Sequence, residues 1–181
     1  MNSQNIALVG VLLACGGIVR VMASLVVSAF PIPIVPNLAI SFYCLAIVLI
    51  TPKIEETLCI GIFAGIICAL VSNSIYPLGN FISEPVGALV FLGIYISLSK
   101  YTSHAAGTAM FYASCASGFT FVLIAMIMAW PIISVEYSDM FMFFISMAPI
   151  VLATAFVNVL FIDLLLRLAN RFIISSELSE F

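Results

Sequence analysis

The sequence predicts an all-α integral membrane protein, with six transmembrane helices in a single domain over residues 1–181. Apolar residues make up 65% of the chain and charged residues only 7%, whereas a soluble domain carries roughly 25% charged residues. The mean hydropathy is +1.33. The apolar runs are continuous, as in membrane helices of ~20 residues, and do not alternate over ~10 residues like the strands of a membrane barrel.

The apolar runs divide the chain into six expected spans, at residues 5–30, 36–51, 54–76, 79–99, 102–130 and 140–171. No Lys or Arg precedes the first run, so we expect this run to be retained as a span and not cleaved as a signal peptide. Three prolines within residues 31–36 favour an extended connection to the second span. We expect Thr51 to cap the third helix, with Glu55 and Glu56 near the positive end of its dipole.

The later boundaries follow from prolines and single charges. Glu84 and Pro85 lie near the start of the fourth span, and Lys100 marks its end. Trp130-Pro131 ends the fifth span. The sixth begins near Met140 and is expected to continue helically to Arg171, with a kink at Pro149.

Basic residues fix the expected orientation, because cytoplasmic loops carry an excess of Lys and Arg. With six spans, all but one of the basic residues fall on one side together with the N-terminus: Lys53, Lys100, Arg167 and Arg171. Both termini are therefore expected in the cytoplasm of a multi-pass cell-membrane protein. The exception, Arg20, lies about 22 Å along the first helix from Asn5, in its outer part.

Several functions are excluded or disfavoured by what the sequence lacks. It has no basic patch for nucleic acid and no P-loop for ATP. Its five cysteines form no C-x-x-C pair and accompany a single histidine, so neither a metal site nor a cofactor is expected. Because no catalytic motif stands out, we do not expect an enzyme, although a membrane enzyme with an unfamiliar site remains an alternative.

Polar residues inside or beside the apolar runs indicate a binding site. A charge near the bilayer centre costs roughly 2.5–3.5 kcal/mol on insertion scales, and Arg20 and Glu84 are expected at similar depth. The candidate substrate-binding residues are Arg20, Asn37, Tyr76, Asn80, Phe81 and Glu84. For a zwitterionic solute, Arg20 would bind the carboxylate and Glu84, helped by Asn80, the ammonium group. Alternatively, Arg20 reaches the lipid headgroups, Glu84 caps a helix, or the two form a structural ion pair.

Small residues recur every fourth position in several spans, a spacing that lets helix backbones approach closely. They serve either internal packing or contact with another membrane subunit. For the second role the best candidates are Gly10 and Ala14 in the first span.

Three stretches of the first half carry a family resemblance. They read NIALVGVLLACGGIVR, PNLAISFYCLAIVLITPKIEETLCIGIFAGIICAL and PLGNFISEPVGALVF. In the order of turns and spans over residues 5–100, the chain resembles the substrate-binding S components of energy-coupling factor (ECF) transporters, and most of all the tryptophan-transporter family. The acidic Glu84 stands where this resemblance leads us to expect a basic residue.

The resemblance implies a transmembrane scaffold subunit that docks on the first helix, and two cytoplasmic ATPases. The expected function is uptake of a small organic nutrient, with tryptophan or a related aromatic compound as the first choice. Two alternatives remain open: a vitamin-specific S component, for biotin, thiamine or a flavin, and a membrane assembly protein without transport.

Overall fold

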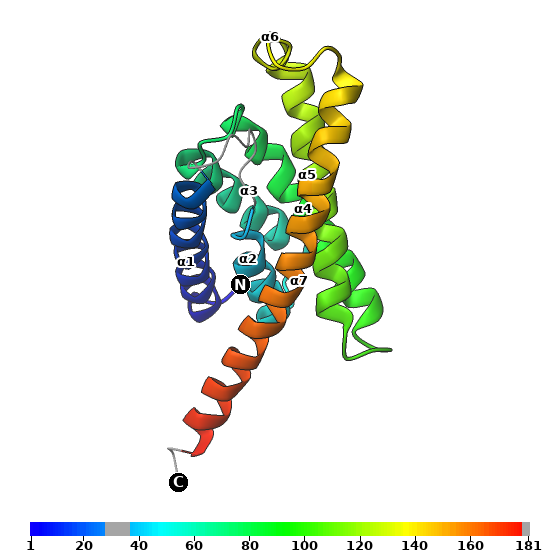
Figure 1. The fold of residues 1–181 in the computed structure, drawn as a ribbon. Coiled ribbons are helices and arrows are strands. Elements are labelled where there is room, and N and C mark those ends of the chain that lie inside the picture. Colours follow the sequence, from blue (N-terminus) through cyan, green and yellow to red (C-terminus); the bar gives the residue numbers. More distant parts are fainter. Residues whose placement is uncertain (28–36, 179–181) are drawn as a thin grey trace.

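The computed structural model describes residues 1–27 and 37–178, and side chains within residues 1–26 and 37–171. Regular structure in these residues is entirely helical. The elements are α1 (Ser3–Val27), α2 (Ile40–Ile50), α3 (Ile54–Val71), the 3-10 turn η1 (Pro77–Gly79), α4 (Asn80–Leu98), α5 (Ala105–Met128), α6 (Trp130–Ile133) and α7 (Met140–Leu178). In Figure 1, α1 lies on one side of the bundle and α4, α5 and α7 on the other.

Five helices of the described chain are long and apolar enough to cross a membrane, and they match five of the six predicted spans. The remaining apolar helix, α2, has 11 residues and a length of about 16 Å, against a hydrocarbon core of about 30 Å. The helix in the second predicted span, residues 36–51, is therefore shorter than predicted. Its first described residues, Asn37–Ala39, precede the helix, and the helix ends before Thr51.

The junction between α2 and α3 differs from the predicted N-cap. Thr51 is the C-terminal cap of α2, with φ 42° and ψ 64° in the left-handed region, and Lys53 is the N-cap of α3. The carboxylate of Glu56 accepts the Lys53 backbone N–H at 2.9 Å, while Glu55 and Glu56 lie in the first turn as predicted. Thr51 thus lies two residues before the N-cap of α3 and belongs to the end of α2.

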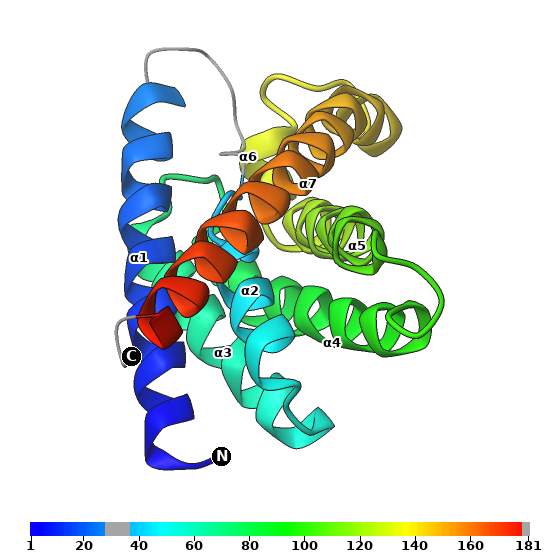
Figure 2. The ribbon, with the colours of Figure 1, turned by 90° about the horizontal axis from the view of Figure 1, so that it is seen from below.

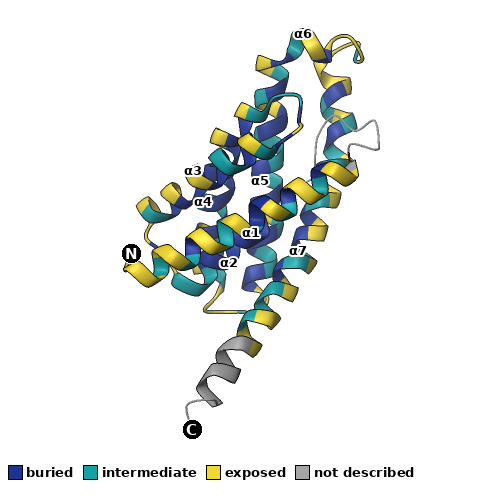
Figure 3. Cartoon of the chain, turned by 90° about the vertical axis from the view of Figure 1, so that its left-hand side faces the viewer, coloured by how far each residue is buried: buried dark blue, intermediate teal, exposed yellow. Residues whose placement is uncertain are grey.

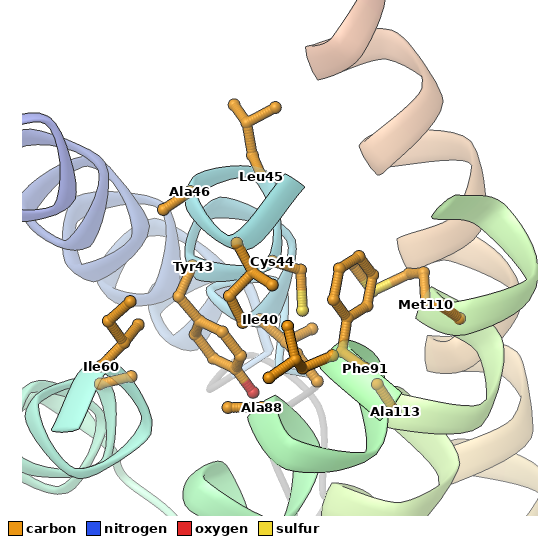
Figure 4. Close-up of a cluster of buried hydrophobic side chains, with 14 of the residues drawn as sticks. Ile40, Tyr43, Cys44, Leu45, Ala46, Ile60, Ala88, Phe91, Met110 and Ala113 are labelled. Atoms are coloured by element: carbon orange, nitrogen blue, oxygen red, sulfur yellow. The ribbon is translucent and has the colours of Figure 1, made fainter. Parts of the chain in front are cut away.

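Helix α2 lies at the centre of the bundle (Figure 2) and contacts all five long helices. Residues Ile40–Ile47 are all buried, as expected for a helix that is apolar all round. Tyr43 and Cys44 pack with Ala88 and Phe91 of α4 and with Met110 of α5 in the main apolar cluster (Figure 4). This central position allows a short helix to have almost no surface facing outwards.

Helices α3 and α4 pack closely because α3 carries glycines at the contact. A Cβ atom at Gly61 would lie 2.6 Å from the Cα of Pro85, and one at Gly65 would lie 2.7 Å from the backbone oxygen of Asn80. The small-residue spacing in α3 therefore serves packing within this chain.

The two ends of the bundle differ. Helix α6 covers one end, and the predicted break at Trp130-Pro131 is confirmed, since α5 ends at Met128 and α6 begins at Trp130. Helix α7 continues past the predicted Arg171 to Leu178 and extends beyond the bundle at the opposite end (Figure 1). The Met1 amino group forms an ion pair with Glu56, which joins the starts of α1 and α3.

Candidate functional site

An open cavity of about 500 Å³, counted with the space at its mouth, lies inside the bundle. Its lining comes from α1, α2, α4, α5, α7 and the segments before α2 and α4: Arg20, Asn37, Ile40, Ser74, Asn80, Ser83, Glu84, Ser114, Ser117, Gly118, Phe121, Ile150, Val151, Thr154 and Asn158. The cavity therefore combines polar groups with an apolar wall.

One end of the cavity, here called the cationic end, is formed by Arg20. Its side chain is 2% exposed, and its Nη2 donates hydrogen bonds to Ser72 Oγ and Asn80 Oδ1, both at 3.3 Å. Its Nε and Nη1 have no hydrogen-bond partner within the described chain. Buried guanidinium N–H groups are costly to leave unpaired, so this end is suited to an anionic oxygen.

A second polar part of the lining, here called the acceptor end, is formed by Glu84 on α4. Its side chain is 1% exposed, and its two oxygens accept hydrogen bonds from Asn37 Nδ2 at 2.6 Å and from Tyr43 Oη at 2.9 Å. A carboxylate has about four lone-pair sites, so it retains acceptor capacity. The buried Asn37 Oδ1 and Ser83 Oγ also lack partners within the described residues. This end is suited to a hydrogen-bond donor.

The two charges do not pair with each other. Among the described residues, the one direct ion pair joins Met1 and Glu56. A structural ion pair between Arg20 and Glu84, one of the alternatives drawn from the sequence, does not occur among the described residues. Each side chain has neutral partners of its own. Arg20 is bonded to Ser72 and Asn80, and Glu84 to Asn37 and Tyr43. Both side chains line the same cavity without a direct ion pair between them.

The structure brings together four of the six predicted site residues: Arg20, Asn37, Asn80 and Glu84. Asn80 belongs to the cationic end and not, as expected, to Glu84, since its Oδ1 accepts from Arg20 and its Nδ2 donates to the Pro77 oxygen at 2.7 Å. Tyr76 packs beside Phe121, and Phe81 is 41% exposed; neither lines the cavity. The extended connection predicted at residues 31–36 lies outside the described residues.

Sequence reasoning missed the wall contributed by α5 and α7. It consists of Ser114, Ser117, Gly118 and Phe121 on α5 and Ile150, Val151, Thr154 and Asn158 on α7. Phe121 is the aromatic residue of the lining. Asn158 was the one detectable signal, because an amide within a long apolar run has to find partners inside the protein.

Gly10 and Ala14 lie on the outward face of α1, and both are exposed. A Cβ atom at Gly10 would have no neighbour within 4 Å, and the residues around it include the exposed Ile6 and Val11 (Figure 3). The side of α1 that packs internally carries Gly16 and Gly17 instead, which face Ala39 and Ile67.

The arrangement is suited to binding a solute with both acceptor and donor groups. No cluster of three His, Cys, Asp or Glu side chains that could hold a metal ion occurs in the described residues. Comparisons with protein-family models, curated proteins and solved structures give no match to this chain.

Proposed function

We propose that this chain is the membrane-embedded substrate-binding subunit, or S component, of an ECF-type importer in the cell membrane. The solute is a small organic nutrient, with tryptophan or a related aromatic compound as the first choice. The proposal combines the resemblance over residues 5–100 with the cavity. The observation that carries it is the buried Arg20, which lines the cavity with two nitrogens that have no partner among the described residues.

The contacts of the site support binding in preference to a purely structural role. A structural ion pair would bring Arg20 and Glu84 together, whereas each has neutral partners. Cationic and acceptor ends on one cavity are complementary to the carboxylate and ammonium groups of an amino acid. The apolar wall, with Phe121 and Ile150, offers a surface for an apolar side chain.

In the proposed membrane arrangement the chain has six spans and both termini in the cytoplasm. Helix α2 counts as one of the six crossings. A transmembrane scaffold subunit would contact the outward face of α1 around Gly10 and Ala14, which no other part of the described chain covers. Two cytoplasmic ATPases would supply energy.

The function is tested by measuring binding to the purified protein by isothermal titration calorimetry. The panel contains L-tryptophan, other aromatic amino acids, biotin, thiamine and riboflavin. We expect one solute to bind and Arg20→Ala to weaken it by about tenfold or more, since a charge-assisted hydrogen bond contributes roughly 1.5–3 kcal/mol. The control is Arg167→Ala, which removes an exposed arginine of α7 that does not line the cavity.

Two outcomes would contradict the proposal. If no member of the panel binds to the folded parent protein, a role in membrane assembly becomes the better interpretation. If Arg20→Ala and Glu84→Gln bind the solute as tightly as the parent, the binding site lies elsewhere. Size-exclusion chromatography in detergent establishes that each variant remains monodisperse.

A further inference from the structure

Asn158 is a polar residue within the apolar helix α7, and all the hydrogen-bonding groups of its side chain have partners. Its Nδ2 donates to the backbone oxygen of Asn37 and to Ser114 Oγ, both at 3.0 Å. Its Oδ1 accepts from Ser41 Oγ at 3.3 Å. The side chain has no exposed surface. Asn158 therefore joins α7 to α5, to α2 and to the segment that precedes α2.

The bond to Asn37 also concerns the solute site. Asn37 lies before the first turn of α2, and no helical hydrogen bond holds its position. Its backbone oxygen is bonded to Asn158, and its side-chain Nδ2 donates to Glu84 Oε1 at 2.6 Å. Because both groups belong to one residue, a fixed carbonyl restricts the directions that the side chain can take. Asn158, Asn37 and Glu84 thus form a chain of contacts from α7 to α4.

Asn37 presents its other amide atom, Oδ1, as a buried acceptor without a partner in the described chain. The rotation of the Asn37 side-chain amide therefore determines both the hydrogen bond to Glu84 and the direction of the Oδ1 atom. It directs the N–H toward Glu84, and it leaves the oxygen available to a donor group in the cavity. A shift of the segment before α2 would change both.

We propose that Asn158 is a positioning residue for the acceptor end of the cavity. Through Asn37 it fixes the hydrogen bond to Glu84 and the orientation of the Asn37 oxygen, and so sets the selectivity for a solute that carries a cationic donor group. The selectivity part of this inference rests on the proposed function, whereas the positioning part does not.

The positioning role is tested without any solute, by infrared spectroscopy of the full chain in detergent. The difference between the parent and Glu84→Gln identifies the carboxylate band of Glu84. We expect Asn158→Leu to shift this band in the same direction as Asn37→Ala. The matched control is Ser41→Ala, which removes another buried hydrogen bond of Asn158 but not the one to Asn37; it should leave the band in place.

The proposal is overturned if the band does not move in Asn158→Leu, or if Ser41→Ala moves it equally. If Asn158→Leu does not fold, Asn158→Ser is used in the same way, because the serine hydroxyl is too short to reach the Asn37 carbonyl.

Selectivity is tested with L-tryptophan and indole-3-propionate, which share the ring and the carboxylate but differ in the ammonium group. We expect the parent to prefer tryptophan by about tenfold or more. Asn158→Leu should lose most of this preference, measured as the ratio of the two affinities. Equal weakening of both probes would overturn the selectivity role. If the parent binds neither probe, the choice of a tryptophan-like solute is wrong, and the infrared result still decides the positioning role.

Discussion

At the scale of single residues, two opposite charges are buried around one cavity without neutralising each other directly. Arg20 and Glu84 are 2% and 1% exposed, and each is supported by two neutral hydrogen-bond partners. Removing an ion from water costs several kcal/mol, which neutral partners offset only in part. Both charges therefore retain a tendency to bind an opposite charge, which a solute can satisfy.

The partners of Glu84 are expected to matter for stability. Tyr43→Phe removes the 2.9 Å hydrogen bond to Glu84 Oε2 and leaves a buried carboxylate with one donor. We expect the free energy of unfolding to fall by about 1.5–3 kcal/mol, observed as a lower melting temperature in detergent. The control is Tyr95→Phe, because the Tyr95 ring stacks on Phe91 and this stacking survives the loss of its hydroxyl. Equal destabilisation by the two variants would contradict the prediction.

The sequence identifies the charged residues of the site better than their partners. Arg20 and Glu84 are conspicuous because charges are rare in these runs, whereas Tyr43 is an ordinary residue of an apolar helix. Phe81 was predicted in the site together with Asn80, as aromatic surface at the same depth, but adjacent residues point about 100° apart around a helix. Asn80 is accordingly 2% exposed and Phe81 41%. Which side of α4 faces inwards is set by packing, which sequence spacing alone does not determine.

At the scale of helices, the contact between α3 and α4 depends on the absence of a side chain at Gly61. In Gly61→Ala the new Cβ would meet the Cα of Pro85 at 2.6 Å, so the helices have to separate. We expect a loss of about 1–3 kcal/mol in thermal or denaturant unfolding, as for other overpacked interiors. In the control Gly93→Ala, nothing lies within 4 Å of the new methyl group. A Gly61→Ala protein as stable as Gly93→Ala would contradict this prediction.

The outward face of α1 gives a second prediction at this scale. Gly10→Leu or Ala14→Leu adds bulk on an uncovered surface, so folding and solute binding should be retained. Copurification with a coexpressed scaffold subunit should be lost, since two helix backbones could no longer meet there. Gly17→Leu is the contrasting variant, because a Cβ atom at this position would lie 2.9 Å from the Ile67 side chain. We expect this variant to be impaired in folding. Retained copurification in all folded variants would exclude this docking face.

Helix ends could be predicted from the sequence where a proline or a change in polarity lies at the helix end itself. The break between α5 and α6 and the start of α7 at Met140 agree with the sequence. The start of α2 was not predictable from hydropathy, because Asn37–Ala39 continue the apolar run although they are not helical. The Asn37 carbonyl accepts from Asn158 of α7, which lies 121 positions later, whereas the carbonyls of Leu38 and Ala39 accept from Ser41 and Phe42 of α2.

At the scale of the whole molecule, the apolar character of the chain predicts a helical membrane protein, and five helices have the required length. Hydropathy cannot show how many times the chain crosses, because it does not distinguish a full span from a short helix enclosed by others. Helix α2 is such a case, with an uninterrupted apolar sequence and 11 helical residues.

The topology is predicted to have six crossings. Reporter fusions after residues 53 and 100 should show a cytoplasmic location, because Lys53 and Lys100 lie there, and fusions near 78 and 136 should show an external one. Alkaline phosphatase and green fluorescent protein provide complementary readouts. An external location after residue 100 would contradict the arrangement, and so would equal locations after 53 and 78.

The central position of α2 has a consequence for how the chain is inserted and assembled. A helix of about 16 Å is too short to span the hydrocarbon core of a bilayer. Its stability depends on the helices that pack against it on every side. Two of those neighbours, α5 and α7, are synthesised after α2. Helix α2 therefore reaches its final environment only after α7 has been synthesised. Until then, the apolar side chains of α2 have to be kept from water by lipid, the insertion machinery or a chaperone.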